Sequence, residues 1–490
     1  MARDITITDP AFSRPDGGDD GLTPAGLQPL RLLARRRMAV LAANLAILAA
    51  LTWGMANVFG AGGWSVSDLV IMAAFLIGAP WSVMGVVNAG LGLWLFHGAR
   101  DGMDQAAPHL AAGDTDAPVS TRVAVAMTLR NEDPGPSFAK LAEMRRSLDA
   151  TGYGHLFDIF VLSDTTDPET AAEEERLFHA MQHRLGASAR YRRRSDNTGF
   201  KAGNVHDFLA GMGRSYPLYL PLDSDSVMDG ATVIRMLRIM EAHPRIGILQ
   251  SLVVGMPAPS PFARIFQFGM RHGMRCFTMG SAWWQGDCGP YWGHNALIRA
   301  EPFRRYCRMP VLAGRPPLGG HARSPEQVTG AHMRRACPAV RGVPGEAGAW
   351  EENPPTLMDF TKRDLRWCQG NMQYWKLLGM KGLRPVSRFQ LVAAIMMYLA
   401  APAWMAMTLA AMSKMVTGDT GVNVSFGIAM FFIMIAVSFV PKIAGLVDVM
   451  LTPGGVRRYG GHARFGLGAV SELVFSTLLA PVVALRVTIF

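Results

Sequence analysis

The sequence predicts a membrane α-helical bundle with a cytosolic α/β domain inserted into it, and three observations support this fold class. Half of the 490 residues are hydrophobic and only 18% are charged, a balance that is unusual for a soluble protein. Five apolar runs are long enough to cross a bilayer. Between the second and third runs, residues 100–388 have the composition of a soluble domain in which predicted strands alternate with predicted helices.

The N-terminal region sets the orientation of the predicted bundle. Residues 1–30 are polar and rich in Asp, Gly and Pro, so we expect a disordered cytosolic tail there. An arginine cluster within residues 31–37 precedes the first apolar run. Because basic residues stay on the cytoplasmic side, the N-terminus is predicted to be inside. Residues 31–99 then hold two transmembrane helices, at about 38–59 and 69–96.

Residues 100–388 are predicted to form one cytosolic α/β domain, with strands at 122–127, 157–162, 216–222 and 246–253 and helices at 138–150 and 168–185. Strands that alternate with helices favour a parallel sheet covered on both faces. Residues 389–490 contain at least three more transmembrane segments, at about 391–412, 426–440 and 465–489. The net charge of +10 is concentrated beside these spans, so we expect a lipid bilayer and no nucleic acid as partner.

Two amphipathic segments are predicted to lie in the membrane interface. Bulky apolar side chains alternate with arginines over about 263–284, and a similar pattern covers about 355–372. For the first segment, an ordinary core helix is the alternative interpretation.

Two carboxylates follow the predicted strand 216–222. Asp223 and Asp225 are separated by one residue, and ligands of open α/β sheets bind beyond the carboxyl ends of strands. Such carboxylates can hold a divalent cation, and a solvated acidic turn is the alternative. Pro217 and Pro221 weaken the strand prediction, because proline cannot donate a hydrogen bond to a neighbouring strand.

Polar residues follow the other predicted strands in a recognisable order. The sequence reads Thr-Leu-Arg-Asn-Glu from residue 128, Ser-Asp-Thr from residue 163 and Gly-Phe-Lys-Ala-Gly-Asn from residue 199. Together with the aspartate pair, these fragments resemble the nucleotide-sugar half of a family 2 glycosyltransferase with the GT-A (Rossmann-like) fold. The resemblance implies that the aspartate pair binds diphosphate and a metal, Mg²⁺ or Mn²⁺. It assigns nucleotide-sugar binding to Thr128, Glu132, Asp164, Lys201 and Asn204.

Two longer stretches are more specific. Residues 291–299 read Tyr-Trp-Gly-His-Asn-Ala-Leu-Ile-Arg, and residues 351–371 contain the Arg-Trp of the Gln-x-x-Arg-Trp signature of processive synthases, with Arg363 at the Gln position. Both stretches resemble the glucans biosynthesis glucosyltransferase H family, which makes the β-1,2-linked backbone of osmoregulated periplasmic glucans from UDP-glucose. The resemblance covers roughly residues 30–490. It assigns nucleotide-sugar binding to Arg366 and glucan-acceptor binding to Trp292, His294, Asn295 and Trp367.

The segment that carries the general base differs from the family pattern. The family has an Asp in a Ser-His-Asp-Phe-Val-Glu type segment, whereas residues 324–329 read Ser-Pro-Glu-Gln-Val-Thr and place Glu326 at the position of the base. A glutamate can accept a proton, but its carboxylate reaches about one methylene further, and a small displacement of a catalytic group slows a reaction strongly. Ser324 is predicted to cap the following helix, with Pro325 at its first position.

The resemblance implies a metal-dependent, inverting glucosyltransferase of the bacterial inner membrane that exports a growing β-glucan through its own spans. UDP-glucose and the glucan acceptor are then the ligands, and a periplasmic glucan-processing protein and acyl carrier protein are partners by resemblance only. Two alternatives stay open. A cellulose- or hyaluronan-like synthase is disfavoured by the Tyr-Trp-Gly-His-Asn segment. A catalytically impaired membrane subunit that binds nucleotide-sugar and senses its supply is favoured by the altered segment 324–329.

Overall fold

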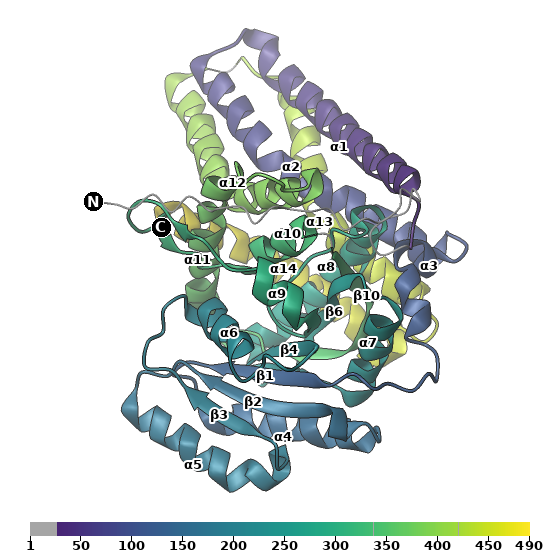
Figure 1. The fold of residues 1–490 in the computed structure, drawn as a ribbon. Helices are drawn as coiled ribbons and strands as arrows, with labels where there is room; N and C mark the ends of the chain where they lie inside the picture. Colours follow the sequence, from purple (N-terminus) through teal and green to yellow (C-terminus); the bar gives the residue numbers. More distant parts are fainter. Residues whose placement is uncertain (1–26, 337, 420) are drawn as a thin grey trace.

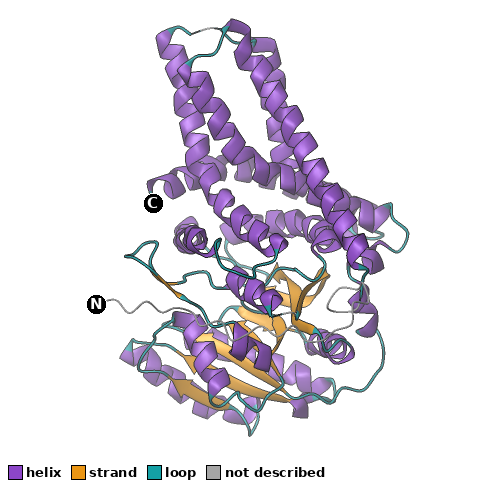
Figure 2. Cartoon of the chain, turned by 45° about the horizontal axis from the view of Figure 1, so that its top comes forward, coloured by secondary structure: helices purple, strands orange, loops and turns teal. Residues whose placement is uncertain are grey.

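The computed structural model describes residues 27–490 apart from residues 337 and 420. This part of the chain contains 5 helices that are long and apolar enough to cross a membrane, and they coincide with the five apolar runs. Figures 1 and 2 show several of them extending away from the strands to one side of the molecule. The five helices are α1 (Leu30–Phe59), α2 (Val66–His97), α12 (Pro385–Thr417), α13 (Val424–Leu451) and α14 (His462–Ile489).

The tail expected over residues 1–30 lies mostly outside the described residues, which begin at residue 27. The last residues of this segment are packed against the domain. Gln28 is only 5% exposed, and its Nε2 donates a hydrogen bond to the carbonyl of Gln105 at 3.2 Å. The part of the expected tail that the structure describes is therefore ordered, because its polar side chain finds a buried partner.

The N-terminal arginines contact the end of helix α8 (Pro261–Gln285), which covers the first amphipathic segment. Arg36 donates from Nη1 to the carbonyl of Gln105 at 2.8 Å and to that of Trp283 at 3.3 Å. Arg37 donates from Nη2 to the carbonyl of Gln285 at 2.8 Å. The last carbonyls of a helix have no partner within the helix, so these cations stabilise the C-terminus of α8.

An eight-stranded sheet forms the centre of the α/β domain, in the order β3-β2-β1-β4-β7-β6-β10-β5. Strands β3, β2, β1 and β4 are parallel to one another, but β7 is antiparallel to β4 and β6, and β5 is antiparallel to β10. The expected parallel sheet is therefore wrong for β7 and β5, whereas β6 and β10 are parallel to each other. Strand β7 runs the opposite way because it enters the sheet from a loop at the carboxyl end of β4. The strands are β1 (Val123–Leu129), β2 (Phe157–Ser163), β3 (Arg190–Arg193), β4 (Leu218–Asp223), β5 (Ser226–Met228), β6 (Ile246–Gly255), β7 (Ala296–Arg299) and β10 (Ala339–Glu351).

Strand β4 accommodates Pro221 because the strand next to it ends early. Strand β7 pairs with β4 only at Leu218 and Tyr219. The carbonyl of Pro221 points to the same side and accepts a hydrogen bond from the backbone N–H of Asn295 at 2.9 Å. The amide and the carbonyl of one strand residue face the same side, so the missing N–H of Pro221 leaves no carbonyl of β7 without a donor.

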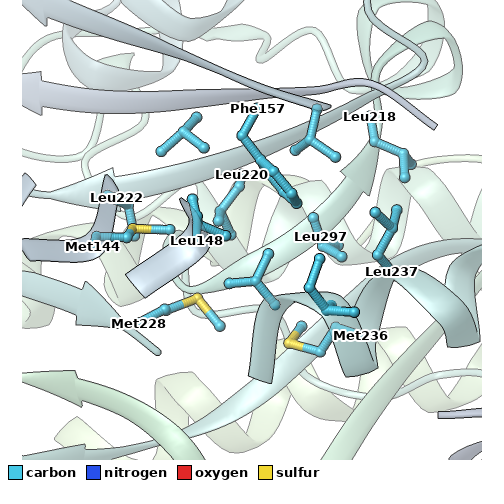
Figure 3. Packing of buried hydrophobic residues seen from close by; sticks show 14 of the residues in the cluster. Met144, Leu148, Phe157, Leu218, Leu220, Leu222, Met228, Met236, Leu237 and Leu297 are labelled. Carbon is cyan, nitrogen blue, oxygen red and sulfur yellow. The ribbon is translucent and has the colours of Figure 1, made fainter. Parts of the chain in front are cut away.

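Helices cover both faces of the sheet. On one face, leucine and methionine side chains of the strands pack against those of α4 and α7, as Figure 3 shows. On the other face, Phe208 of α6, Phe303 of α9 and Met333 of α10 pack against the strands. Each fully buried large side chain of this kind contributes about 1.5–3 kcal/mol to folding. The helices are α3 (Gly102–Ala106), α4 (Pro134–Ala150), α5 (Pro168–Leu185), α6 (Phe200–Ala210), α7 (Gly230–Ala242), α9 (Ala300–Tyr306), α10 (Glu326–Arg335) and α11 (Leu357–Gln373), and a small hairpin pairs β8 (Val311–Leu312) with β9 (Gly320–His321).

Buried ion pairs fix the long helices to one another and to the domain. Asp448 of α13 is 1% exposed and contacts both His97 at the end of α2, at 2.8 Å, and Arg275 of α8. Lys414 of α12 pairs with the buried Asp68 of α2 at 2.8 Å. Charges within membrane helices need such partners, so these pairs define the register of α2 against α12 and α13.

Candidate active site

One cavity of about 1130 Å³ lies between the carboxyl ends of β1, β2 and β4, the helices α10 and α11, and the long apolar helices. It brings together every site residue predicted from the sequence except Asn295. These lining residues are Thr128, Glu132, Asp164, Lys201, Asn204, Asp223, Asp225, Trp292, His294, Glu326, Arg366 and Trp367.

The register of the parallel strands places the first of these residues at one edge of the sheet. Thr128 of β1 is paired with Asp223 of β4, and Leu129 is paired with Ser163 of β2. The backbone N–H of Asp164 donates to the carbonyl of Leu129 at 2.8 Å. The three strands therefore end at the same level, where an open α/β sheet binds its ligands.

The aspartate pair carries two carboxylates in different electrostatic surroundings. Asp223 forms an ion pair with Lys201 of α6. Burial by itself would raise the pKa of Asp223, but the positive charges of Lys201 and His294 lower it below its usual range. Burial, together with the negative charges of Asp223 and Glu351, raises the pKa of Asp225. The negative charge of Asp223 is thus balanced by nearby positive side chains, whereas Asp225 is surrounded by further negative charge.

The donor set fits a hard divalent cation. Two carboxylates that crowd each other are relieved by a cation, and their oxygens are the ligands that Mg²⁺ and Mn²⁺ prefer. Across residues 27–490 without the two omitted positions, no group of three or more His, Cys, Asp and Glu side chains is arranged to hold a metal ion. A cation at Asp223 and Asp225 would therefore complete its coordination with oxygens from a ligand or from water.

A buried ion pair that the sequence did not reveal holds Asp164 in place. Arg194, just beyond β3, donates from Nε and Nη2 to the two carboxylate oxygens of Asp164 at 2.8 and 2.7 Å. Asn204 of α6 donates to the same carboxylate at 2.8 Å and is itself 1% exposed. The side-chain amide of Asn204 also donates a hydrogen bond to the Leu162 carbonyl, so Asn204 fixes Asp164 relative to strand β2. The arginine-rich segment of residues 190–194 was the available signal.

The loop after β1 is fixed by its own side chains. Asn131 adopts a left-handed conformation, with φ of 61°, and its side-chain oxygen accepts from the backbone N–H groups of Thr166 at 2.9 Å and Asp167 at 3.1 Å. This turn directs Glu132 into the cavity, where its carboxylate accepts from the backbone N–H of Arg130. Burial raises the pKa of Glu132.

Glu326 lies at the first position of α10 and faces the cavity. A Cβ atom added to Gly293, whose φ is +94°, would come within 2.7 Å of the Glu326 Cγ, so the glutamate side chain packs directly over this glycine. Burial raises the pKa of Glu326, and the nearby charge of Lys201 opposes that shift. A carboxylate with a raised pKa is a stronger base, which suits proton abstraction near neutral pH.

The predicted helix cap at Ser324 is wrong. Pro325 occupies the N-cap position of α10, and no side chain caps this helix. The Ser324 carbonyl accepts a hydrogen bond from the Tyr374 hydroxyl at 2.8 Å, and its own hydroxyl is buried without a partner among the described residues. Packing against α11, where Gly370 lies beside the serine, has decided the orientation of this side chain.

The segment before β7 presents His294 to the cavity and keeps Asn295 out of it. His294 contacts the Ser226 hydroxyl through Nδ1 at 3.0 Å and the Glu351 carboxylate through Nε2 at 3.4 Å. Asn295 is fully buried with φ of 51°, and its Nδ2 donates to the carbonyl of Trp350 at 3.2 Å. Asn295 thus supports the segment that carries His294, and Glu351 joins the site from β10.

Helix α11 supplies the cations and an aromatic ring on the far side of the cavity. Thr356 caps this helix, since its hydroxyl accepts from the backbone N–H of Asp359 at 3.2 Å. Arg363, Arg366 and Trp367 lie three and four residues apart, and therefore on one face of the helix. All three line the cavity, and the Trp367 side chain is 40% exposed.

The cavity continues between the long apolar helices. Its lining there combines methionine and other aliphatic side chains with aromatic rings and uncharged polar groups, and the rings and polar groups are the kinds that contact sugars. These residues include Trp81 and Asn88 of α2, Ser281 and Gln285 of α8, Phe389, Gln390 and Tyr398 of α12, and Ser438 of α13.

Comparison with known proteins gives the chain a family. No family model matches it. It is 36% identical over 470 residues to the glucans biosynthesis glucosyltransferase H of Xanthomonas campestris pv. campestris, an alignment that covers 91% of this chain and 72% of that protein. The protein of the same name from Cereibacter sphaeroides is 34% identical over 477 residues, with 91% and 78% covered, and that from Vibrio cholerae is 34% identical over 469 residues, with 92% and 64% covered.

Among solved structures, a mannosyltransferase from Pyrobaculum calidifontis, in complex with GDP-Man and Mn²⁺, overlaps with a TM-score of 0.45 at 15% identity, over 77% of this chain and 99% of that one. TarS from S. aureus overlaps with a TM-score of 0.36 at 12% identity, over 58% of this chain and 47% of that one.

The Rossmann-like half-sheet, the strand-end carboxylates and the apolar helices define a GT-A glycosyltransferase domain carried on a membrane bundle, as the sequence predicts. Within that class, the extent of the match to the Xanthomonas and Cereibacter proteins identifies the family. The chain belongs to the glucans biosynthesis glucosyltransferase H family.

Proposed function

We propose that the protein transfers glucose from UDP-glucose to a growing β-1,2-linked glucan, with inversion at the anomeric carbon and with Mg²⁺ or Mn²⁺ as cofactor, and that it exports the product. The observation that carries this proposal is the single cavity that joins the aspartate pair, Glu326 and the polar groups of the long helices. Donor, acceptor and exit path would then share one space. The relatives named above are glucan biosynthesis glucosyltransferases, which supports glucose as the transferred sugar.

The cavity residues have distinct roles in this proposal. A cation held by Asp223 and Asp225 would supply Lewis-acid stabilisation of the leaving diphosphate. Lys201 and Arg366 add positive charge where the diphosphate departs. Thr128, Glu132 and the strand-end loop of Asp164 bind the nucleoside side of the donor.

Proton transfer and acceptor binding fall to the opposite side of the cavity. Glu326 takes the proton from the attacking hydroxyl, and its raised pKa strengthens it as a base. Trp367 and Trp292 provide flat apolar faces for sugar rings, and His294 offers a polar contact to the acceptor. Holding the hydroxyl in line with the donor is the main contribution that such a site makes to rate.

The test is glucose transfer by the purified full chain, with UDP-glucose and a short β-1,2-glucan acceptor, in a titration of Mg²⁺ and of Mn²⁺. A cation-dependent release of UDP together with a β-linked product would support the proposal, because the glucose of UDP-glucose is α-linked. UDP that binds without any transfer would instead favour the nucleotide-sugar sensor suggested by the segment 324–329.

We also propose that the α/β domain lies in the cytosol at the bacterial inner membrane. The arginines near the start of α1 favour this orientation, which places the α12–α13 loop outside. In a variant without the 5 native cysteines, Val416→Cys should react with an impermeant thiol reagent in intact cells. Glu169→Cys, on the domain surface, should react only after permeabilisation. The reverse pattern would overturn this orientation.

A further inference from the structure

The side chain of Arg363 on α11 has no polar partner within the described chain. No hydrogen bond or ion pair joins its guanidinium to a described residue, and its Nε is buried without an acceptor. Its guanidinium lies over the ring of Trp367, with 4.8 Å between the guanidinium carbon and the ring centroid. The carboxylates of Glu351 and Asp225 act on its charge from a distance, and Arg366 opposes them.

A half-buried cation without an acceptor is unfavourable, because its lost hydration is not replaced. Nearly all buried polar groups in folded proteins have a partner, so an exception in a cavity wall indicates a ligand. Arg366, the neighbouring cation on α11, likewise has no hydrogen bond or ion pair to a described residue, whereas two cations near the strand ends are paired. Lys201 is paired with Asp223 and Arg194 with Asp164, whereas Arg363 faces open space.

The chemistry of the missing partner follows from the donor. A guanidinium offers a planar fork of N–H groups that fits two oxygens of one phosphate, and it prefers phosphate or carboxylate. A nucleoside diphosphate and a lipid headgroup both present such oxygens. Because Arg363 shares the cavity with the aspartate pair and Arg366, the position favours the diphosphate.

Arg363 also fixes the aromatic ring that faces the acceptor. Arg363 and Trp367 are four residues apart on α11 and therefore adjacent on the helix surface. A guanidinium stacked on an indole restrains the ring and is itself oriented by it. An anion bound to Arg363 would therefore hold the guanidinium, and with it the Trp367 ring, in one position.

We propose that Arg363 binds the diphosphate of the donor beside Arg366 and positions Trp367 for the acceptor, so that donor binding orders the acceptor platform. This inference rests on the proposed function and adds a residue and a coupling to it. The glutamine that processive synthases carry at this position is uncharged, so Arg363→Gln tests the charge while keeping a polar, though shorter, side chain.

The experiment measures UDP and uridine affinities of the full chain by calorimetry with Mg²⁺ present, for the parent, Arg363→Gln, Arg363→Lys and Lys362→Gln. Lys362 is the exposed neighbour on α11 and serves as control. We expect Arg363→Gln to weaken UDP affinity about tenfold or more, which is the scale of one charge-assisted hydrogen bond. The affinity for uridine, which lacks the diphosphate, should stay constant. Arg363→Lys should keep UDP affinity within about threefold, since the charge remains, but raise the acceptor KM because an ammonium does not stack as a plane.

Several outcomes would overturn the inference. Equal UDP affinity of the parent and Arg363→Gln excludes a diphosphate contact. An equal loss for uridine indicates a structural role only. A loss of UDP affinity seen in phosphatidylglycerol nanodiscs but absent in phosphatidylcholine nanodiscs assigns Arg363 to an anionic lipid headgroup, because both lipids carry a phosphate but only phosphatidylglycerol has a net charge. A parent that binds no UDP at all overturns the proposed function and this inference together, whereas a parent that binds UDP tests Arg363 alone.

Discussion

The two sides of the cavity differ in how completely the chain pairs its own polar groups. On the proposed donor side, formed by the ends of β1, β2 and β4, Asp164 is held by Arg194 and Lys201 pairs with Asp223. On the acceptor side, formed by the segment before β7 with α10 and α11, Arg363 has no described partner and Trp367 is 40% exposed. In the proposed function, the paired groups of the donor side are preorganised, which lowers the cost of binding, and the unpaired Arg363 on the acceptor side is completed by the diphosphate of the donor.

The aspartate pair should show the largest effect of any single change. Asp225→Asn removes one charge from the cation site and should lower turnover by at least about a thousandfold, with weakened metal-dependent UDP binding. Asp149→Asn removes the charge of a 52% exposed carboxylate that pairs with Arg145 and does not line the cavity, so turnover should stay close to that of the parent. Steady-state glucose transfer over a metal titration is the measurement, and normal turnover of the Asn variant would remove Asp225 from the site.

Glu326 tests the acceptor side. Glu326→Gln keeps the size of the side chain but removes the proton acceptor, so turnover should fall about a hundredfold or more while UDP affinity changes little. Glu326→Asp restores the shorter acid of the family and should retain activity or raise it. Equal transfer rates for the parent and the Gln variant would exclude Glu326 as the base and leave it as a favourable charge at the start of α10.

Arg194 tests the preorganisation of the donor side. Arg194→Gln leaves the buried Asp164 carboxylate without its charged partner, which typically costs about 3–5 kcal/mol. We expect faster amide hydrogen exchange in the β2–α5 loop and weaker uridine binding. Arg146→Gln, which breaks an exposed pair with Glu143, is the matched control and should change neither. Unchanged exchange in Arg194→Gln would mean that other contacts hold the loop.

The sequence predicted which residues gather at the strand-end edge of the cavity, because these residues directly follow strands. A strand followed by an acid is a local pattern, and parallel strands bring such ends to one edge of the sheet. Arg194 and Glu351 were missed because they lie at the ends of β3 and β10. Only the order of the strands in the folded sheet brings these ends to the site. Asn295 lies next to a cavity residue, but its left-handed backbone turns its side chain into the interior.

The fold shows the same division between local and long-range information. The transmembrane helices follow from the length of apolar runs, a property of the chain alone. The direction of β7 cannot be read from the chain in this way, because a strand of four residues can join a sheet in either direction. Its direction is decided by the preceding segment, which contains Gly293. For the same reason Ser324 matched a local capping pattern that packing against α11 overrode.

The smallest predicted effects are the stability changes caused by substitutions at the N-termini of two helices on the acceptor side, α10 and α11. The Thr356 hydroxyl caps α11, whereas the Ser324 hydroxyl makes no hydrogen bond to any described residue although its sequence suggests a cap. Thr356→Ala should therefore cost about 1 kcal/mol and loosen the first turn of the helix that carries Arg363 and Trp367. Ser324→Ala removes a buried hydroxyl without a partner and should be neutral or slightly stabilising. Thermal unfolding in detergent and hydrogen exchange over α10 and α11 would measure both. A larger loss for Ser324→Ala than for Thr356→Ala would show that Ser324 caps α10 in solution, and that the acceptor side is more completely paired than its contacts indicate.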